Sequence, residues 1–215
     1  MKFGILGTGI VGQTIGSKLA MRGHEVMLGG RAKTHEKAEA WATSQGKAAS
    51  YGDFASAARF GEIAFLCTKG DGALAAAEAA KGELAGKIVI DITNPLDFSK
   101  GFPPHLFVSN TDSLGEQLQA ALPESQVVKA LNTMSCEVMV DAARVGADSD
   151  VFVSGNDDTA KATVSGLLRE QFGWKHVVDL GDITTARGTE AYLLLWVRLY
   201  GALKTADFNL RLVRK

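Results

Sequence analysis

Three glycines near the start of the chain, Gly7, Gly9 and Gly12, have the G-x-G-x-x-G spacing that can bind a phosphate group. They directly follow a short apolar run and open a segment in which Ile15 and Leu19 recur at helical spacing. In that setting the first glycine permits a tight turn, the second lets the backbone approach a pyrophosphate, and the third allows close helix packing. Backbone amides and the helix dipole then bind the phosphates. We therefore predict a dinucleotide site here, with a glycine-rich turn that binds no ligand as the alternative.

The end of the second predicted strand should decide which dinucleotide binds. NAD sites of this kind place Asp or Glu there, about 20 residues further on, to bind the ribose hydroxyls. Here the chain reads Gly29-Gly30-Arg31-Ala32-Lys33, with no acid, which leaves room for a phosphate. A guanidinium group can bind a phosphate through paired hydrogen bonds and can stack on adenine. We predict NADP, contacted by Gly30, Arg31 and Lys33; the alternatives are a surface arginine without a specific contact and a solvated lysine.

Three further segments, at 67–69, 93–95 and 131–134, follow predicted strands. Ligands of open α/β sheets bind beyond the carboxyl ends of the strands, so we expect the nicotinamide among these segments. The amides of Asn94 and Asn132 can bind the carboxamide or a substrate, while Pro95 and Met134 can form apolar walls. Asn132 is the candidate catalytic residue, acting by positioning. The predicted cofactor contacts in these segments are Cys67, Thr68, Lys69, Asn94, Pro95, Asn132, Thr133 and Met134.

Each of these segments also has an ordinary structural interpretation. The Asn94-Pro95 pair is typical of a turn, and Asn132 can simply cap one. A lysine at a strand end, such as Lys69, more often reaches solvent than serves as a general acid. Cys67 is more often a buried core residue than a nucleophile.

The sequence contains no recognisable acid–base triad or metal-binding motif. Cys67 and Cys136 form no CxxC pair and have no histidine at metal-ligand spacing, so we predict reduced thiols, a cytoplasmic protein and no metal site. Reduction of a carbonyl needs an acid within reach, whereas hydride transfer between two ring cofactors needs positioning and desolvation. The missing acid therefore favours transfer between cofactors. The histidines are scattered, at His24, His35, His105 and His176.

The elements that must position these residues alternate as strands and helices, which predicts a doubly wound Rossmann fold with a mostly parallel sheet and a small C-terminal α/β extension. Apolar runs predict strands near 2–6, 25–28, 48–50, 63–67, 88–91, 127–130, 151–154 and 175–180. Apolar residues at three- or four-residue spacing predict helices near 11–22, 34–44, 73–81, 113–122 and 159–170. The proline-rich segment 94–104 should be an ordered loop at a strand end.

The composition is that of an ordinary globular protein, with 46% apolar and 22% charged residues. A formal net charge of −1 argues against a nucleic-acid partner. Glycines interrupt the apolar N-terminus, and no apolar run approaches the roughly 18 residues that a membrane helix needs. We therefore predict neither a signal peptide nor a membrane partner.

We expect residues 1–135 to form the NADP-binding domain and residues 136–215 a small domain for the cleft and for dimerisation. A strongly apolar helix is predicted over Ala191–Leu203, with Tyr192, Trp196 and Tyr200 four residues apart. It is apolar over more than one face, which predicts that a second subunit covers it in a homodimer. The alternative is a helix fully buried within one subunit.

Five motifs together resemble one enzyme family: GTGIVG at the start, GGR ending at Arg31, VVKALNT, SGNDD and LGDITTARGTE. The chain is similar to coenzyme F420-dependent NADP oxidoreductases, which transfer hydride between NADP and an 8-hydroxy-5-deazaflavin. The resemblance implies a Rossmann domain, a small C-terminal domain, a homodimer, and a second cofactor over the nicotinamide. It also implies that Thr8, Ile10, Val11 and Arg31 contact NADP.

Two other functions stay open at this point. Archaeal members of the family tend to have histidine where this chain has Asn132, and the oxidoreductase domains of six-transmembrane ferric reductases have a similar Asn-Thr pair and use a flavin. The second hypothesis is therefore an NADPH-dependent reductase of a flavin or of a small carbonyl or imine substrate. The third is a non-catalytic NADP sensor.

Overall fold

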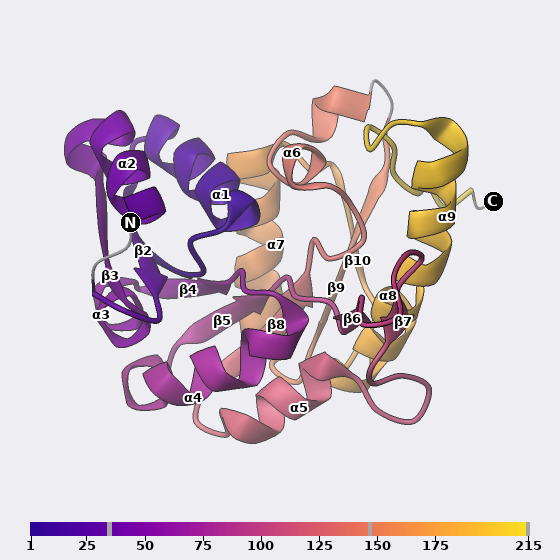
Figure 1. Cartoon of the computed structure of the whole chain (residues 1–215), viewed down its shortest axis with the longest axis horizontal. Helices are drawn as coiled ribbons and strands as arrows, with labels where there is room; N and C mark the ends of the chain where they lie inside the picture. The colour runs from indigo at the N-terminus through magenta and orange to yellow at the C-terminus, as the bar shows by residue number, and fades with distance from the viewer. Residues whose placement is uncertain (34–35, 146–147, 214–215) are drawn as a thin grey trace.

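A single twisted sheet forms the centre of the molecule. The computed structural model describes residues 1–33, 36–145 and 148–213 of the chain (Figure 1). The eight strands of the sheet lie in the order β3-β2-β1-β4-β5-β8-β9-β10; every neighbouring pair is parallel except β8 and β9, so β9 and β10 run opposite to the other six. Their bounds are β1 Lys2–Leu6, β2 Glu25–Gly30, β3 Ala49–Asp53, β4 Ile63–Leu66, β5 Ile88–Asp91, β8 Gln126–Ala130, β9 Asp150–Gly155 and β10 His176–Asp179.

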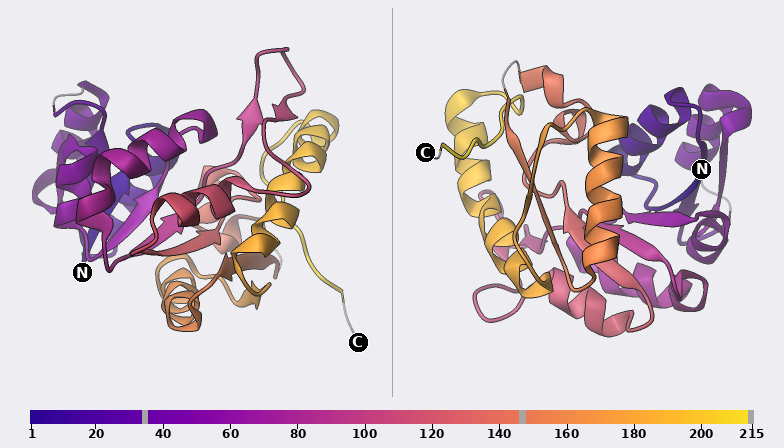
Figure 2. Two further views of the ribbon diagram at one scale, coloured as in Figure 1. Left: turned by 90° about the horizontal axis from the view of Figure 1, so that it is seen from below. Right: turned by 180° about the vertical axis from the view of Figure 1, so that it is seen from behind.

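Helices cover both faces of this sheet, as Figure 2 shows from two sides. Strands β1, β4 and β8 are buried along nearly their whole length, which is the pattern expected when a parallel sheet is covered on both faces. One core cluster includes residues of α1, α2, α6 and α7, and the other includes residues of α3, α4 and α5. The helices are α1 Ile10–Met21, α2 Glu36–Gln45, α3 Phe54–Phe60, α4 Ala73–Leu84, α5 Leu114–Ala121, α6 Cys136–Met139, α7 Asp158–Phe172, α8 Ala186–Ala191 and α9 Leu193–Leu203.

The predicted doubly wound Rossmann fold is confirmed, and each predicted strand has its counterpart. Sequence patterns did not predict α3, whose first turn is capped by the Asp53 carboxylate accepting from the Ser56 amide at 2.8 Å. The predicted helix at 34–44 is described from Glu36, because Thr34 and His35 lie outside the described residues. The helix predicted over Ala191–Leu203 is interrupted at Tyr192, which separates α8 from α9.

The predicted loop at 94–104 contains the first strand of a small hairpin. Strands β6 (Leu96–Asp97) and β7 (His105–Leu106) pair antiparallel and project from the body of the molecule (Figure 2, left). The predicted domain boundary at residue 135 falls between β8 and β9, and β9 continues the same sheet. The division into two domains stays a prediction. Among the described residues, no helix is long and apolar enough to cross a membrane.

Candidate functional site

The glycine turn joins β1 to α1 at the carboxyl edge of the sheet, and a different physical constraint explains each of its three glycines. Gly7 has a φ of +139°, and a Cβ there would lie 2.6 Å from the carbonyl oxygen of Cys67. A Cβ on Gly12 would lie 2.3 Å from the carbonyl oxygen of Gly7, so this glycine allows α1 to pack closely. Gly9 is exposed, and a Cβ on it would have no neighbour within 4 Å. The space beside Gly9 is therefore open to a ligand.

The end of β2 carries no acidic side chain and presents positive charge. A Cβ on Gly29 would lie 2.7 Å from the Ala57 side chain of α3, so packing alone explains that glycine. Arg31 and Lys33 follow β2 and are exposed, and no described carboxylate pairs with Arg31. The carboxyl of Asp53, which pairs with Gly30 in the sheet, accepts hydrogen bonds from Ser56 instead, and these lower its pKa. Within the described residues, nothing therefore prevents Arg31 from binding an anion.

The two predicted asparagines meet at the edge of the sheet. Asn94 Nδ2 donates to the carbonyl oxygen of Asn132 at 2.8 Å, and Asn132 Nδ2 donates to Asn94 Oδ1 at 3.0 Å. Asn132 is buried, and the residue before it, Leu131, has a φ of +62°. A leucine in this left-handed conformation is strained, and such strain is often found at functional sites. The pair leaves one N–H of each amide and the Oδ1 atom of Asn132 for a ligand.

Two buried hydroxyls near this pair have no hydrogen-bond partner among the described residues. They are Thr68 Oγ1, after β4, and Ser135 Oγ, before α6. Buried polar atoms are normally paired, so these hydroxyls are available to a ligand. Cys67 instead belongs to the core. Its burial raises the pKa of the thiol well above the ordinary value, and the charge of Asp91 adds to this. Lys69 is exposed, as a solvated strand-end lysine would be.

The structure brings all the predicted site segments to one edge of the sheet, because β2, β1, β4, β5 and β8 are parallel neighbours. Their roles as ligand contacts stay predictions. The buried ones are Gly7, Gly12, Gly30, Cys67, Pro95, Asn132, Thr133 and Met134; Thr8, Val11, Thr68 and Asn94 are half-buried; Gly9, Ile10, Arg31, Lys33 and Lys69 are exposed.

A buried ion network under this edge escaped the sequence analysis. Lys129 Nζ lies 2.7 Å from Asp91 Oδ2 and 2.8 Å from Glu190 Oε1, and the three side chains are 2% exposed or less. The Glu190 carboxylate also accepts from the amides of Leu114 and Gly115 at 2.8 and 2.9 Å, at the start of α5. Burial alone would lower the pKa of Lys129, but the two carboxylates raise it above the ordinary value. The ammonium group therefore stays charged in the core.

The same C-terminal motif makes a second contact with α5. Arg187 Nε donates to Glu116 Oε2 at 2.8 Å, and the Ser113 hydroxyl donates to the same oxygen at 2.7 Å. Hydrogen bonding from Arg187 holds the pKa of the Glu116 carboxyl below its ordinary value. The ARGTE part of the LGDITTARGTE motif thus fastens α8 to α5 through Arg187 and Glu190.

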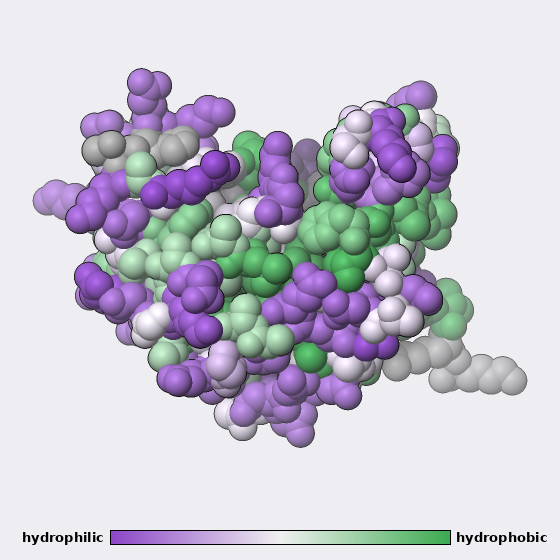
Figure 3. Space-filling view, turned by 60° about the horizontal axis from the view of Figure 1, so that its bottom comes forward, coloured by the Kyte–Doolittle hydropathy of each residue, from purple (hydrophilic) through white to green (hydrophobic). Residues whose placement is uncertain are grey.

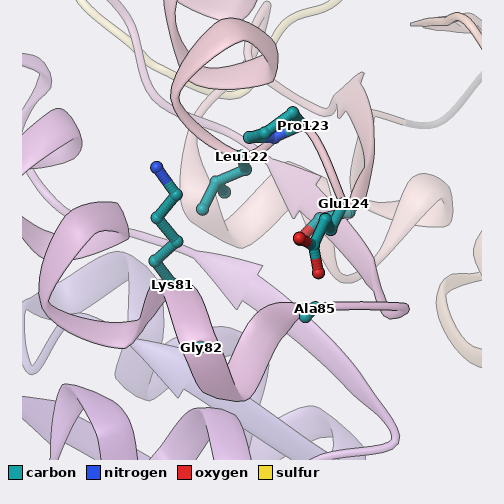
Figure 4. Close-up of a pocket in the computed structure, with 7 residues that line it drawn as sticks. Lys81, Gly82, Ala85, Leu122, Pro123 and Glu124 are labelled. Carbon is teal, nitrogen blue, oxygen red and sulfur yellow. The ribbon is translucent and has the colours of Figure 1, made fainter.

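Other parts of the described structure bring together fewer reactive or ligand-binding side chains. A hollow of about 100 Å³ lies between the end of α4 and the loop before β8, lined by Lys81, Leu122 and Glu124 among others (Figure 4). It opens at the amino ends of β5 and β8, opposite the glycine turn. The histidines that the structure describes are far from forming a triad: His24 pairs with Gln171 at 3.0 Å, and His105 and His176 lie on β7 and β10. His35 lies outside the described residues.

The strand order and the glycine turn together define a protein of the Rossmann class. A family model described as "NADP oxidoreductase coenzyme F420-dependent" matches residues 2–95. The F420-dependent NADP reductase of Methanocaldococcus jannaschii is 30% identical over 223 residues, covering 99% of this chain and 98% of that protein. The chain belongs to the coenzyme F420-dependent NADP oxidoreductase family and is therefore an oxidoreductase. This confirms the family predicted from the motifs.

Two further proteins are similar to the chain. A crystal structure from Arthrobacter sp. FB24, of a protein with the provisional name F420-dependent NADP-reductase, has a TM-score of 0.94, with 48% identity and 100% of both chains covered. Metalloreductase STEAP3 of Rattus norvegicus is 29% identical over 195 residues. That match covers 88% of this chain but 36% of the longer relative.

Proposed function

We propose that the protein transfers hydride between NADP(H) and coenzyme F420 in a cleft at the carboxyl edge of the sheet. The observation that carries the proposal is the reciprocal amide pair of Asn94 and Asn132, which lies where the nicotinamide end of a dinucleotide is expected. Membership of the family supports both cofactors, because two relatives are named F420-dependent NADP reductase.

The residues present fit NADP. The open space beside Gly9 suits the approach of a pyrophosphate, and the first amides of α1 can bind its oxygens. The guanidinium of Arg31 is exposed and has no ion-pair partner among the residues that the structure describes, so it suits the 2′-phosphate, with Lys33 adding positive charge. The unpartnered hydroxyl of Thr68 can bind the ribose or the carboxamide. Thr8, Ile10 and Val11 would complete the phosphate end of the site.

The chain contributes positioning and exclusion of water to the reaction. When bound, NADPH supplies a hydride that the deazaflavin accepts together with a proton from solvent, or the reverse. Asn132 is held by Asn94 and can fix the carboxamide, so that one face of the nicotinamide is presented. Pro95 and Met134 are buried beside this pair and keep water from the nicotinamide end.

We also propose a homodimer formed through α9. In one subunit Leu193 and Val197 are buried, but Leu195 and Leu203 are each 54% exposed, so the alternative of a helix fully buried within one subunit is wrong. Hydrophobic surface gathers on the right of Figure 3, toward the C-terminal end of the chain. A second copy would cover this helix, and residues 136–215 would then serve the cleft and the dimer while residues 1–135 hold NADP.

A spectrophotometric assay tests the proposed reaction. NADPH is mixed with the protein and with coenzyme F420, a flavin, or a panel of small carbonyl and imine compounds, and its absorbance is followed. We expect oxidation with coenzyme F420. Oxidation with a flavin or an imine and none with coenzyme F420 would favour the second hypothesis. Tight NADPH binding without oxidation by any acceptor would favour a sensor.

A further inference from the structure

We propose that Lys129 is a positioning residue for the nicotinamide end of the cleft, acting through the main chain of Thr93. The inference rests on the proposed function, because it assumes that NADP lies with its nicotinamide at Asn94 and Asn132. In this proposal, the buried ion network of Asp91, Lys129 and Glu190 helps to position the cofactor.

The network holds Thr93 at three points. Lys129 Nζ donates to the carbonyl oxygen of Thr93 at 2.7 Å. The Thr93 amide and hydroxyl both donate to Asp91 Oδ1, at 2.8 and 2.7 Å. The carbonyl group of Thr93 belongs to the peptide bond that leads into Asn94, so the ammonium group of Lys129 fixes the backbone from which the Asn94 side chain extends.

The side chain of Asn94 then transmits this position to Asn132. Its amide group both donates to and accepts from Asn132, across the edge from β5 to β8. On the other side, the backbone of Gly70 packs so closely against the carbonyl group of Asn94 that a Cβ on Gly70 would lie 2.1 Å from its oxygen. A shift of the Thr93 carbonyl group would therefore disturb both amides that face the expected carboxamide.

Charge balance alone does not require this arrangement. Replacing a buried ion network by apolar side chains is often neutral or stabilising, so the network is weak evidence for a role in stability. Glu190 already has two amide donors at the start of α5, where a negative charge is favoured. A charge-balanced apolar replacement would lose the ion pair of Lys129 with Glu190 and the bond from Lys129 to the Thr93 carbonyl, and of these two contacts only the second reaches the cleft.

The test variant removes the ammonium group and one of its two carboxylates together, so the net charge of the network stays the same; Glu190 loses its cation but keeps its two amide donors. Lys129→Met alone would leave Asp91 and Glu190 buried without a cation, which is strongly destabilising. The double variant Asp91→Asn/Lys129→Met keeps the same net charge, with Glu190 on the amides of α5, and the new amide oxygen can still accept from Thr93. A matched control is Lys161→Met, because Lys161 is also buried, with Asp158, Asp179 and the carbonyl oxygen of Gly181 around it.

The measurement compares the affinities of NADP⁺ and of 2′,5′-ADP by calorimetry. The fragment lacks the nicotinamide half, so it reports only the glycine turn and Arg31. We expect the double variant to bind the fragment as the wild type does, and NADP⁺ about three- to tenfold more weakly, the loss of one hydrogen-bonded contact. Lys161→Met should change neither affinity.

Each result decides the matter. Undiminished NADP⁺ binding by the folded double variant, or equal losses for both ligands, would overturn the role of Lys129. Failure of the charge-balanced variant to fold would also overturn it, since the network would then be structural. If the wild type itself binds NADP⁺ no more tightly than the fragment, the proposed nicotinamide site is wrong instead.

Discussion

Replacing Arg31 by alanine should separate NADPH from NADH. The Arg31 side chain is exposed, and its removal breaks no ion pair among the described residues. A hydrogen bond to a charged group is worth about 1.5 to 3 kcal/mol, and an exposed site takes the lower end of that range. We therefore expect NADPH to bind about tenfold more weakly and NADH to be unaffected.

Isothermal titration at low salt measures both affinities, because salt screens a contact at the surface. Arg22→Ala is the matched control. Arg22 is also exposed, but it caps the far end of the twelve-residue helix α1, about 18 Å along the helix axis from the glycine turn. The control should leave both affinities unchanged. Equal losses of NADPH and NADH in Arg31→Ala would refute the assignment of Arg31 to the 2′-phosphate.

Three further changes test other parts of the structure. Gly9→Val should abolish binding of both dinucleotides in a folded protein, because the space beside Gly9 is open; undiminished binding in calorimetry would mean that the pyrophosphate lies elsewhere. Leu195→Glu should turn a dimer into a stable monomer in light scattering, whereas a monomeric wild type at micromolar concentration contradicts the dimer. Arg187→Ala should lower the free energy of unfolding slightly at neutral pH, because it removes a partly exposed ion pair. Because pairing lowers the pKa of Glu116, this difference should fade as the pH falls through that lowered pKa, and urea unfolding that shows it undiminished in acid would contradict the pair.

Most of the sheet could be predicted because its strands are short apolar runs between turn residues. The helix α3 could not, since its seven residues hold only one and a half to two turns and its buried side chains are two small alanines, Ala57 and Ala58. A local signal existed in Asp53, which caps the helix through Ser56. The break at Tyr192 gave no signal, because that residue keeps helical dihedral angles.

The candidate site was predictable where it follows the rule that ligands bind at carboxyl strand ends. That rule places Asn94 and Asn132 at the ends of neighbouring strands, where their side chains form hydrogen bonds. The ion network could not be assembled in the same way, because pairing of Lys129 with Glu190 depends on how α8 packs against α5. One sign was present: a lysine within the apolar run VVKAL is almost never buried without a partner.

The partnership of Glu190 with α5 also bears on the order in which the protein can fold. The amide of Leu114 donates to the Glu190 carboxylate, which lies 76 residues further along the chain. At the usual rate of synthesis of about 5 to 20 residues per second, this is roughly 4 to 15 seconds. Until α8 is made, Lys129 can have only one of its two carboxylate partners, and the start of α5 lacks its acceptor. The start of α5 and the ammonium group of Lys129 thus gain their full set of partners only when α8 docks.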